Sequence, residues 1–152
     1  MTHEASLQRL IKFFESITPD TAQQLASVYT DDVWFKDPFN EVTGIAAVSN
    51  IFIHMFQQVD APRFVVTRSV LQDDDAFLTW DFLFRMKRHS SEEQCIRGAT
   101  HLRFAADGRV EFHRDYWDAA EELYEKLPLL GGLMRWLKRL ARADFPKSDS
   151  RD

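Results

Sequence analysis

The stretch His113-Arg114-Asp115-Tyr116-Trp117-Asp118 ends the last of a series of predicted strands and leads directly into an acidic helix start at 119–122. It places the carboxylate of Asp115 where a sheet normally buries apolar side chains. A second carboxylate, Asp37, follows the apolar strand segment 33–36 and precedes a proline, which keeps it extended. Together the two carboxylates predict a pocket that holds ionisable groups.

Strand-forming residues dominate the second half of the chain. β-Branched and aromatic residues are frequent in four segments, which turn-forming residues separate. The segments are 64–71, 76–88, 94–104 and 109–117. Their order and short connections predict an antiparallel meander.

Helical spacing of apolar residues dominates the first half. Residues 7–17 carry one apolar stripe, and Thr18-Pro19-Asp20 is typical of the start of a second helix that buries residues up to Tyr29. Asp31-Asp32 is expected to end that helix, and a third runs from 45 to 59. Helices that precede strands predict an α+β domain, with three N-terminal helices covering one face of a curved antiparallel sheet.

The C-terminal segment predicts one more helix, which is amphipathic and basic. Its stripe of leucine and tryptophan over 133–140 is flanked by arginine and lysine. We expect it to pack over the cavity mouth as a lid or dimer clasp, with binding to an anionic membrane as the alternative. The single domain is expected to span 1–143, and the tail 144–152 is expected to fray.

Composition excludes several classes of protein. With 45% hydrophobic residues and 13 phenylalanines in 152 residues, the chain is predicted to fold around one core. A net charge of -5 argues against nucleic-acid binding, which needs a basic face. The first residues lack the basic and apolar regions typical of a signal peptide, and no apolar run approaches the roughly 20 residues that span a bilayer, so we expect a cytoplasmic protein. The single cysteine, Cys95, predicts neither an internal disulfide nor a cysteine cluster for metal.

Alternation along the segment 76–88 predicts two committed sheet faces. Trp80, Phe82 and Phe84 share one face that is too apolar to be left in water, and Thr79 and Asp81 share the other. We expect the tryptophan face to be convex and to form a homodimer, while the other face lines a cavity.

The chain resembles the nuclear transport factor 2-like superfamily over roughly residues 5–127, in its helix-helix-strand-Asp-Pro opening, its third helix, its meander and its Arg-Asp-Tyr-Trp-Asp ending. SnoaL-like polyketide cyclases, ketosteroid isomerases and limonene-type epoxide hydrolases belong to it, and the resemblance implies a cone-shaped barrel. Asp37 matches the carboxylate with which ketosteroid isomerases move a proton. Phe13 and Thr100 stand where those enzymes carry oxyanion donors.

The resemblance to the epoxide hydrolases is also partial. Asp81 and Asp115 match their two carboxylates, whereas Thr79 replaces the arginine between them. Phe35 and Asp37 stand where those enzymes use Tyr and Asn to hold water. The resemblance therefore implies a cavity with several carboxylates and an altered set of partners.

These observations give a candidate site for a small molecule. Asp37, Asp81 and Asp115 are the candidate catalytic residues. Crowded carboxylates in an apolar cavity cannot all ionise, so such a group could pair an acid with a base. The candidate substrate-binding residues are Phe13, Phe35, His54, Thr79, Thr100, His113 and Trp117. No cofactor and no metal are expected.

Simpler structural roles remain open for the same residues. Asp37 would also serve as the cap of an Asx turn, and Asp115 as one partner of a cross-strand ion pair with Arg97 or Arg103. Three functions follow: an acid-base enzyme of isomerase, cyclase or hydrolase type acting on a small apolar or carbonyl-bearing substrate, a non-catalytic ligand binder, or an interaction module.

Overall fold

The computed structural model describes residues 3–87 and 92–122 of the chain. Residues up to Trp117 form one compact unit, and residues 118–122 belong to a second. The predicted C-terminal helix and the tail 144–152 lie outside the described residues, and the domain boundary at 143 stays a prediction.

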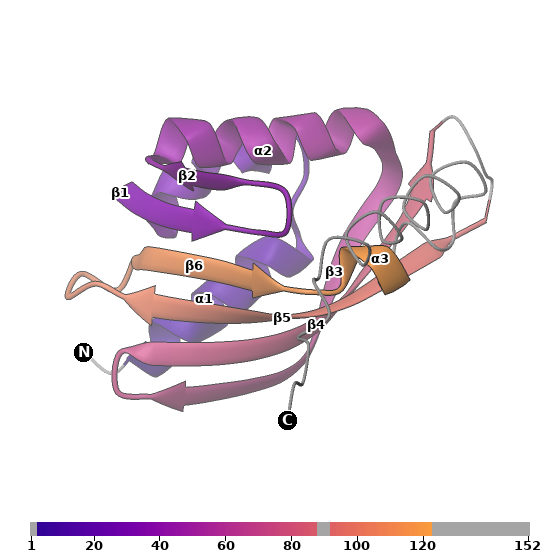
Figure 1. Ribbon diagram of the computed structural model, residues 1–152. Helices are drawn as coiled ribbons and strands as arrows, with labels where there is room; N and C mark the ends of the chain where they lie inside the picture. The colour runs from indigo at the N-terminus through magenta and orange to yellow at the C-terminus, as the bar shows by residue number, and fades with distance from the viewer. Residues whose placement is uncertain (1–2, 88–91, 123–152) are drawn as a thin grey trace, which may run out of the picture. The chain divides into compact units, whose positions relative to one another are not determined.

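Six strands form one curved, open sheet in the order β2-β1-β6-β5-β4-β3 (Figure 1). All neighbouring strands pair antiparallel except β1 and β6, which pair in parallel. The strands are β1 Tyr29–Lys36, β2 Glu41–Thr43, β3 Val59–Gln72, β4 Asp75–Met86, β5 Gln94–Phe104 and β6 Val110–Tyr116. The predicted meander is thus β3 to β6, and the α+β class is confirmed.

Two helices, α1 (His3–Glu15) and α2 (Ile45–Gln58), bury their apolar sides against the same face of this sheet. Between them in the chain lies the 3-10 helix η1 (Thr21–Ser27). A short helix, α3 (Ala119–Glu122), starts where the acidic sequence predicts, and the Asp118 carboxylate accepts the backbone N–H groups of its first turn. No helix among the described residues is long and apolar enough to cross a membrane.

The second predicted helix differs from its prediction. The Thr18 hydroxyl accepts the Thr21 backbone N–H, but η1 ends at Ser27, and Tyr29 is the first residue of β1. Asp31 and Asp32, expected to break a helix, lie inside β1 with both side chains exposed, at an irregularity in its pairing with β6. The apolar spacing up to Tyr29 fits a helix. Residues from Tyr29 onward form a strand instead because they pair with β6, which is distant in the sequence.

The two faces of β4 are the reverse of those predicted. Trp80, Phe82 and Phe84 are buried on the face that α1 and α2 cover, while Thr79 and Asp81 lie on the opposite face. Exposing an uninterrupted aromatic face to water costs more free energy than exposing a face that carries a carboxylate. The aromatic face is therefore the one that is buried in the core. The predicted dimer contact through Trp80, Phe82 and Phe84 is therefore wrong.

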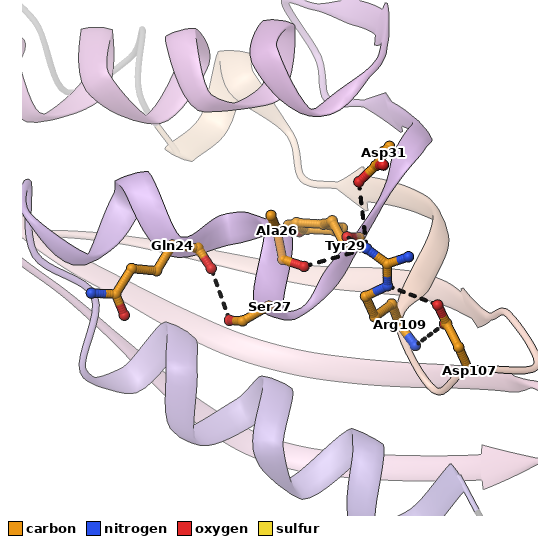
Figure 2. Close-up of polar contacts among 7 residues, drawn as sticks. All are labelled: Gln24, Ala26, Ser27, Tyr29, Asp31, Asp107 and Arg109. Atoms are coloured by element: carbon orange, nitrogen blue, oxygen red, sulfur yellow. Dashed lines mark hydrogen bonds and ion pairs between the residues drawn. The ribbon is translucent and has the colours of Figure 1, made fainter.

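Arg109 holds the start of β1 against the β5–β6 hairpin (Figure 2). Its guanidinium donates to the carbonyl oxygens of Ala26 and Tyr29 at 3.5 and 3.3 Å, and to the carboxylates of Asp31 and Asp107. The Arg109 backbone N–H and guanidinium lower the pKa of Asp107. One side chain thus fixes the segment that carries Tyr29.

We predict that Arg109→Lys lowers the melting temperature by a few degrees, because an ammonium group cannot reach two carbonyls and two carboxylates at once. Differential scanning calorimetry at neutral pH measures the change. Arg63→Lys is the matched control, since Arg63 makes one exposed ion pair with Glu93 and should leave the melting temperature nearly unchanged. Equal melting temperatures for the two variants would contradict the proposed role of Arg109.

Candidate functional site

A cavity of about 50 Å³ lies between α1, α2 and the sheet. One water needs roughly 10–15 Å³, so the space can hold a small ligand or part of one. Asp115 is the only carboxylate in the described lining. The lining consists of Leu10, Ile11, Phe14, Phe52, Phe64, Val66, Leu78, Trp80, Thr100, Leu102, His113 and Asp115.

Strand register brings the polar lining together. His113 and Asp115 are two residues apart on β6, so they point to the same face of the sheet. Thr100 on β5 is the direct partner of Asp115 across the antiparallel pair, and Trp80 reaches Thr100 from β4. Three adjacent strands thus supply one connected group of side chains.

Two hydrogen bonds converge on a single oxygen of Asp115. The Thr100 hydroxyl donates to Oδ1 at 2.5 Å, and His113 Nε2 lies 2.8 Å from the same atom. The other oxygen, Oδ2, accepts no hydrogen bond from the part of the chain that the structure describes. The carboxylate is therefore held on one side and open on the other.

The direction of the bonds follows from the chemistry of the donors. Trp80 Nε1 can only donate, and it donates to Thr100 Oγ1 at 2.7 Å. The single hydroxyl hydrogen of Thr100 is then directed to Asp115. When Asp115 is ionised it can only accept, so His113 Nε2 must carry a hydrogen and donate it.

Tyr29 completes the network from behind. Its hydroxyl lies 2.7 Å from His113 Nδ1, and its side chain is 0% exposed. Burial, with a further contribution from the charge of Asp115, raises the pKa of Tyr29 well above its ordinary value. The neutral phenol can donate to Nδ1 and so fix the tautomer that places the other imidazole hydrogen on Nε2. Phe35 stacks on His113 with ring centroids 4.7 Å apart, which fixes the plane of the imidazole.

Asp37 does not lie with Asp115 in the cavity. Its Oδ1 accepts the backbone N–H groups of Phe39 and Asn40 at 2.8 and 2.7 Å, and both carboxylate oxygens contact the Asn40 amide. This is the Asx-type role that the sequence left open. The predicted convergence of three carboxylates is thus wrong.

The other candidate residues divide into two groups. Thr100 and His113 line the cavity, while Phe35 supports it from behind. The remaining ones lie elsewhere: Asp81 and Thr79 on the outer face of β4, His54 exposed on α2, Phe13 beside Phe14, and Trp117 against Phe39. The carboxylate expected to pair with Asp115 is replaced by an imidazole.

Tyr29, Trp80 and Phe14 belong to the site but were not predicted there. For Trp80 a signal exists, because a face made of leucine, tryptophan and two phenylalanines favours burial. For Tyr29 the local sequence holds no signal, since its partner His113 is 84 residues away. Across residues 3–87 and 92–122 there is no group of three or more His, Cys, Asp or Glu that could hold a metal ion.

We predict that Tyr29→Phe lowers the free energy of unfolding by about 1–3 kcal/mol, because it leaves His113 Nδ1 buried without a partner. Urea denaturation at pH 7 measures the loss. Tyr116→Phe is the matched control, since Tyr116 is 49% exposed and should change little. Similar urea midpoints for the two variants would show that the Tyr29 hydroxyl contributes nothing.

Solved structures with a similar fold share little sequence with this chain. TsrD from Streptomyces laurentii has a TM-score of 0.70 at 17% identity, covering 82% of this chain and 96% of its own. A Catenulispora acidiphila protein with a ketosteroid isomerase-like fold, in complex with trimethylamine, has a TM-score of 0.67 at 14% identity, with 79% and 90% covered. An LEH-like epoxide hydrolase from M. tuberculosis has a TM-score of 0.63 at 13% identity, with 93% and 96% covered.

At these identities the likeness concerns the fold alone, and it agrees with the nuclear transport factor 2-like resemblance. No curated protein matches the chain significantly. The sequence model of the SnoaL-like domain matches residues 10–113, a range that includes nearly all of the cavity lining. The chain therefore belongs to the SnoaL-like domain family.

Proposed function

We propose that this protein is an acid-base enzyme that needs no cofactor and acts on a small, mostly apolar, carbonyl-bearing molecule. The observation that carries the proposal is that only one of the two carboxylate oxygens of Asp115 is hydrogen-bonded to described residues. Its Oδ1 accepts from Thr100 and His113, while Oδ2 accepts no hydrogen bond from the described residues. Asp115 is also one of the residues that line the apolar cavity. A carboxylate held in this way can take a proton from a carbon beside a carbonyl and return it.

Asp115 takes the role that the sequence had divided among three carboxylates. Tyr29 and His113 stand behind it and keep its plane fixed, which lowers the cost of reaching the reactive geometry. Isomerisation or ring closure at a carbon beside a carbonyl can begin with such a proton transfer.

The lining places a limit on the substrate. Each side-chain donor in the described lining already has an acceptor. Trp80 donates to Thr100, and both Thr100 and His113 donate to Asp115. A new enolate oxygen would find no free donor there, and such donors are usually the largest source of rate enhancement. The proposal therefore favours substrates whose carbanion is stabilised internally, such as a carbon between two carbonyl groups.

We predict that the protein exchanges the acidic C–H of small 1,3-dicarbonyl compounds with D₂O faster than buffer does, and much faster than it exchanges simple ketones. Proton NMR of a compound panel measures the exchange. Asp115→Asn should lower the protein-dependent rate by about 100-fold or more. Asp81→Asn, on the outer face, is the control and should retain the rate. Equal rates for the two variants would exclude Asp115 as the base.

Non-catalytic binding of a small ligand is the second candidate. The Catenulispora acidiphila protein is in complex with trimethylamine, and here a single carboxylate faces apolar and aromatic walls, which suits a small organic cation. The same panel, extended with trimethylammonium and read as thermal shift, separates the two functions. Stabilisation without any exchange supports binding alone.

A homodimer remains part of the proposal, through the outer face of the sheet in place of the face that was predicted. On that face Val70 and Phe77 are direct partners and are 62% and 50% exposed. It also carries both signs of charge, because Asp75 lies opposite Arg103 and Asp81 lies opposite Arg97 on β5. A surface with both signs can pair with a second copy of itself about a two-fold axis. The cytoplasmic location and the absence of nucleic-acid partners stay predictions of the sequence.

We predict a dimeric mass in light scattering at micromolar concentration, and a monomeric mass for Phe77→Arg, because a buried guanidinium would face its own copy. The control is Ile53→Arg, which changes an exposed apolar residue on α2 and should stay dimeric. A monomeric mass of the unaltered protein would refute the dimer.

A further inference from the structure

We infer that Gly98, Trp80 and Thr100 together are a positioning device for the Asp115 carboxylate. The inference rests on the proposed function and assigns to these residues the task of keeping Oδ2 free to react. None of the three needs to touch the substrate's reacting atoms. They act through a chain of two hydrogen bonds that ends on Oδ1.

The device starts with the space above Gly98. Gly98 is the direct cross-strand partner of Trp80, and the indole ring occupies the space that a side chain at position 98 would need. A Cβ atom at position 98 would lie 2.5 Å from two carbons of the indole and 3.0 Å from Cε2, the carbon bonded to Nε1. Any side chain at this position must push the indole away from the sheet.

The place of the indole decides where the Thr100 hydrogen points. Trp80 Nε1 reaches Thr100 Oγ1 only because the ring crosses β5 above Gly98. With one side of Thr100 accepting from the indole, the hydroxyl hydrogen is directed at Asp115 Oδ1. Hydrogen bonds linked in this way polarise one another, so the bond to the carboxylate gains from the indole behind it.

If Trp80 had a purely structural role, the site would require different groups from Trp80 and from residue 100. Phe64 meets Trp80 edge to face at 6.0 Å, so the ring would also serve as an apolar wall. A wall needs the ring but not its N–H, and it needs no hydroxyl at position 100. The positioning role needs both, which makes the two roles separable by experiment.

The test needs no substrate. In ¹H-¹⁵N NMR of the full chain, the Trp80 indole N–H is assigned from the signal that Trp80→Phe removes. We expect this N–H to exchange slowly with solvent in the unaltered protein. It should exchange at least about 10-fold faster in Thr100→Val and in Gly98→Ala. Thr100→Ser restores the acceptor and should restore the slow rate. Asp115→Ala, which removes the acceptor of Thr100, should shift the signal more than Asp81→Asn, although Asp81 is the chain neighbour of Trp80.

Unchanged exchange in Thr100→Val, or failure of Thr100→Ser to restore it, would overturn the inference and leave Trp80 as a wall. If Gly98→Ala does not fold, the threonine pair decides alone. In the deuterium-exchange assay, Thr100→Val should lower kcat about 10- to 100-fold with KM nearly unchanged, and Thr100→Ser should recover most of it. A raised KM with unchanged kcat in Thr100→Val would also overturn the inference.

The two proposals fail separately. If the NMR results hold and no compound is exchanged, the hydrogen-bond chain exists but the proposed enzyme activity is wrong. If exchange depends on Asp115 while Thr100→Val keeps full kcat, the activity stands and the positioning role is wrong.

Discussion

The parallel pairing of β1 with β6 is the contact on which the site depends. It joins residues about 80 positions apart in the chain and brings the Tyr29 hydroxyl within 2.7 Å of His113 Nδ1. Arg109 ties the beginning of β1 to the hairpin that precedes β6, so the same pairing is held at its end by charge-assisted hydrogen bonds. Without it, His113 would be a buried imidazole with one free nitrogen, and Asp115 would lose its most rigid support.

Burying a tyrosine, a histidine and a threonine beside a carboxylate costs free energy unless each polar atom has a partner. Here the partners form one chain, from Trp80 through Thr100 to Asp115 and from Tyr29 through His113 to the same oxygen. A chain of this kind is stable only in one arrangement of rotamers, since rotating any member leaves a neighbour unsatisfied. The rigidity that stabilises the core therefore also orients the carboxylate.

The sequence predicted what local patterns encode. The strands of the meander, the acidic start at Ala119 and the α+β class follow from alternation, turn residues and helix-start signals. Asp115, His113 and Thr100 line the cavity, while their roles toward a substrate stay predictions. The sequence-based prediction failed where contacts between residues distant in the chain determine the structure. Tyr29 fits a helix by spacing alone, and Asp37 satisfies the same short motif whether it faces a cavity or closes a turn. The predicted faces of β4 are reversed in the structure, because burial of Trp80, Phe82 and Phe84 stabilises the fold more than placing the Asp81 carboxylate inside a cavity would.

A site whose donors are saturated before a ligand arrives recognises that ligand in a limited way. Among the described lining residues, Asp115 keeps one carboxylate oxygen, Oδ2, without a donor, and the walls are mostly hydrocarbon and aromatic rings. Hydrophobic walls distinguish ligands that differ by one methylene by only about 1–3 kcal/mol, whereas unpaired donors would reject a wrong ligand far more strongly. For the proposed activity, selectivity would then come from the acidity of the substrate and from the shape of the cavity, and less from hydrogen-bond readout. The same saturation keeps the carboxylate from rearranging when the cavity is empty, so the geometry that the proposed proton transfer needs exists before binding.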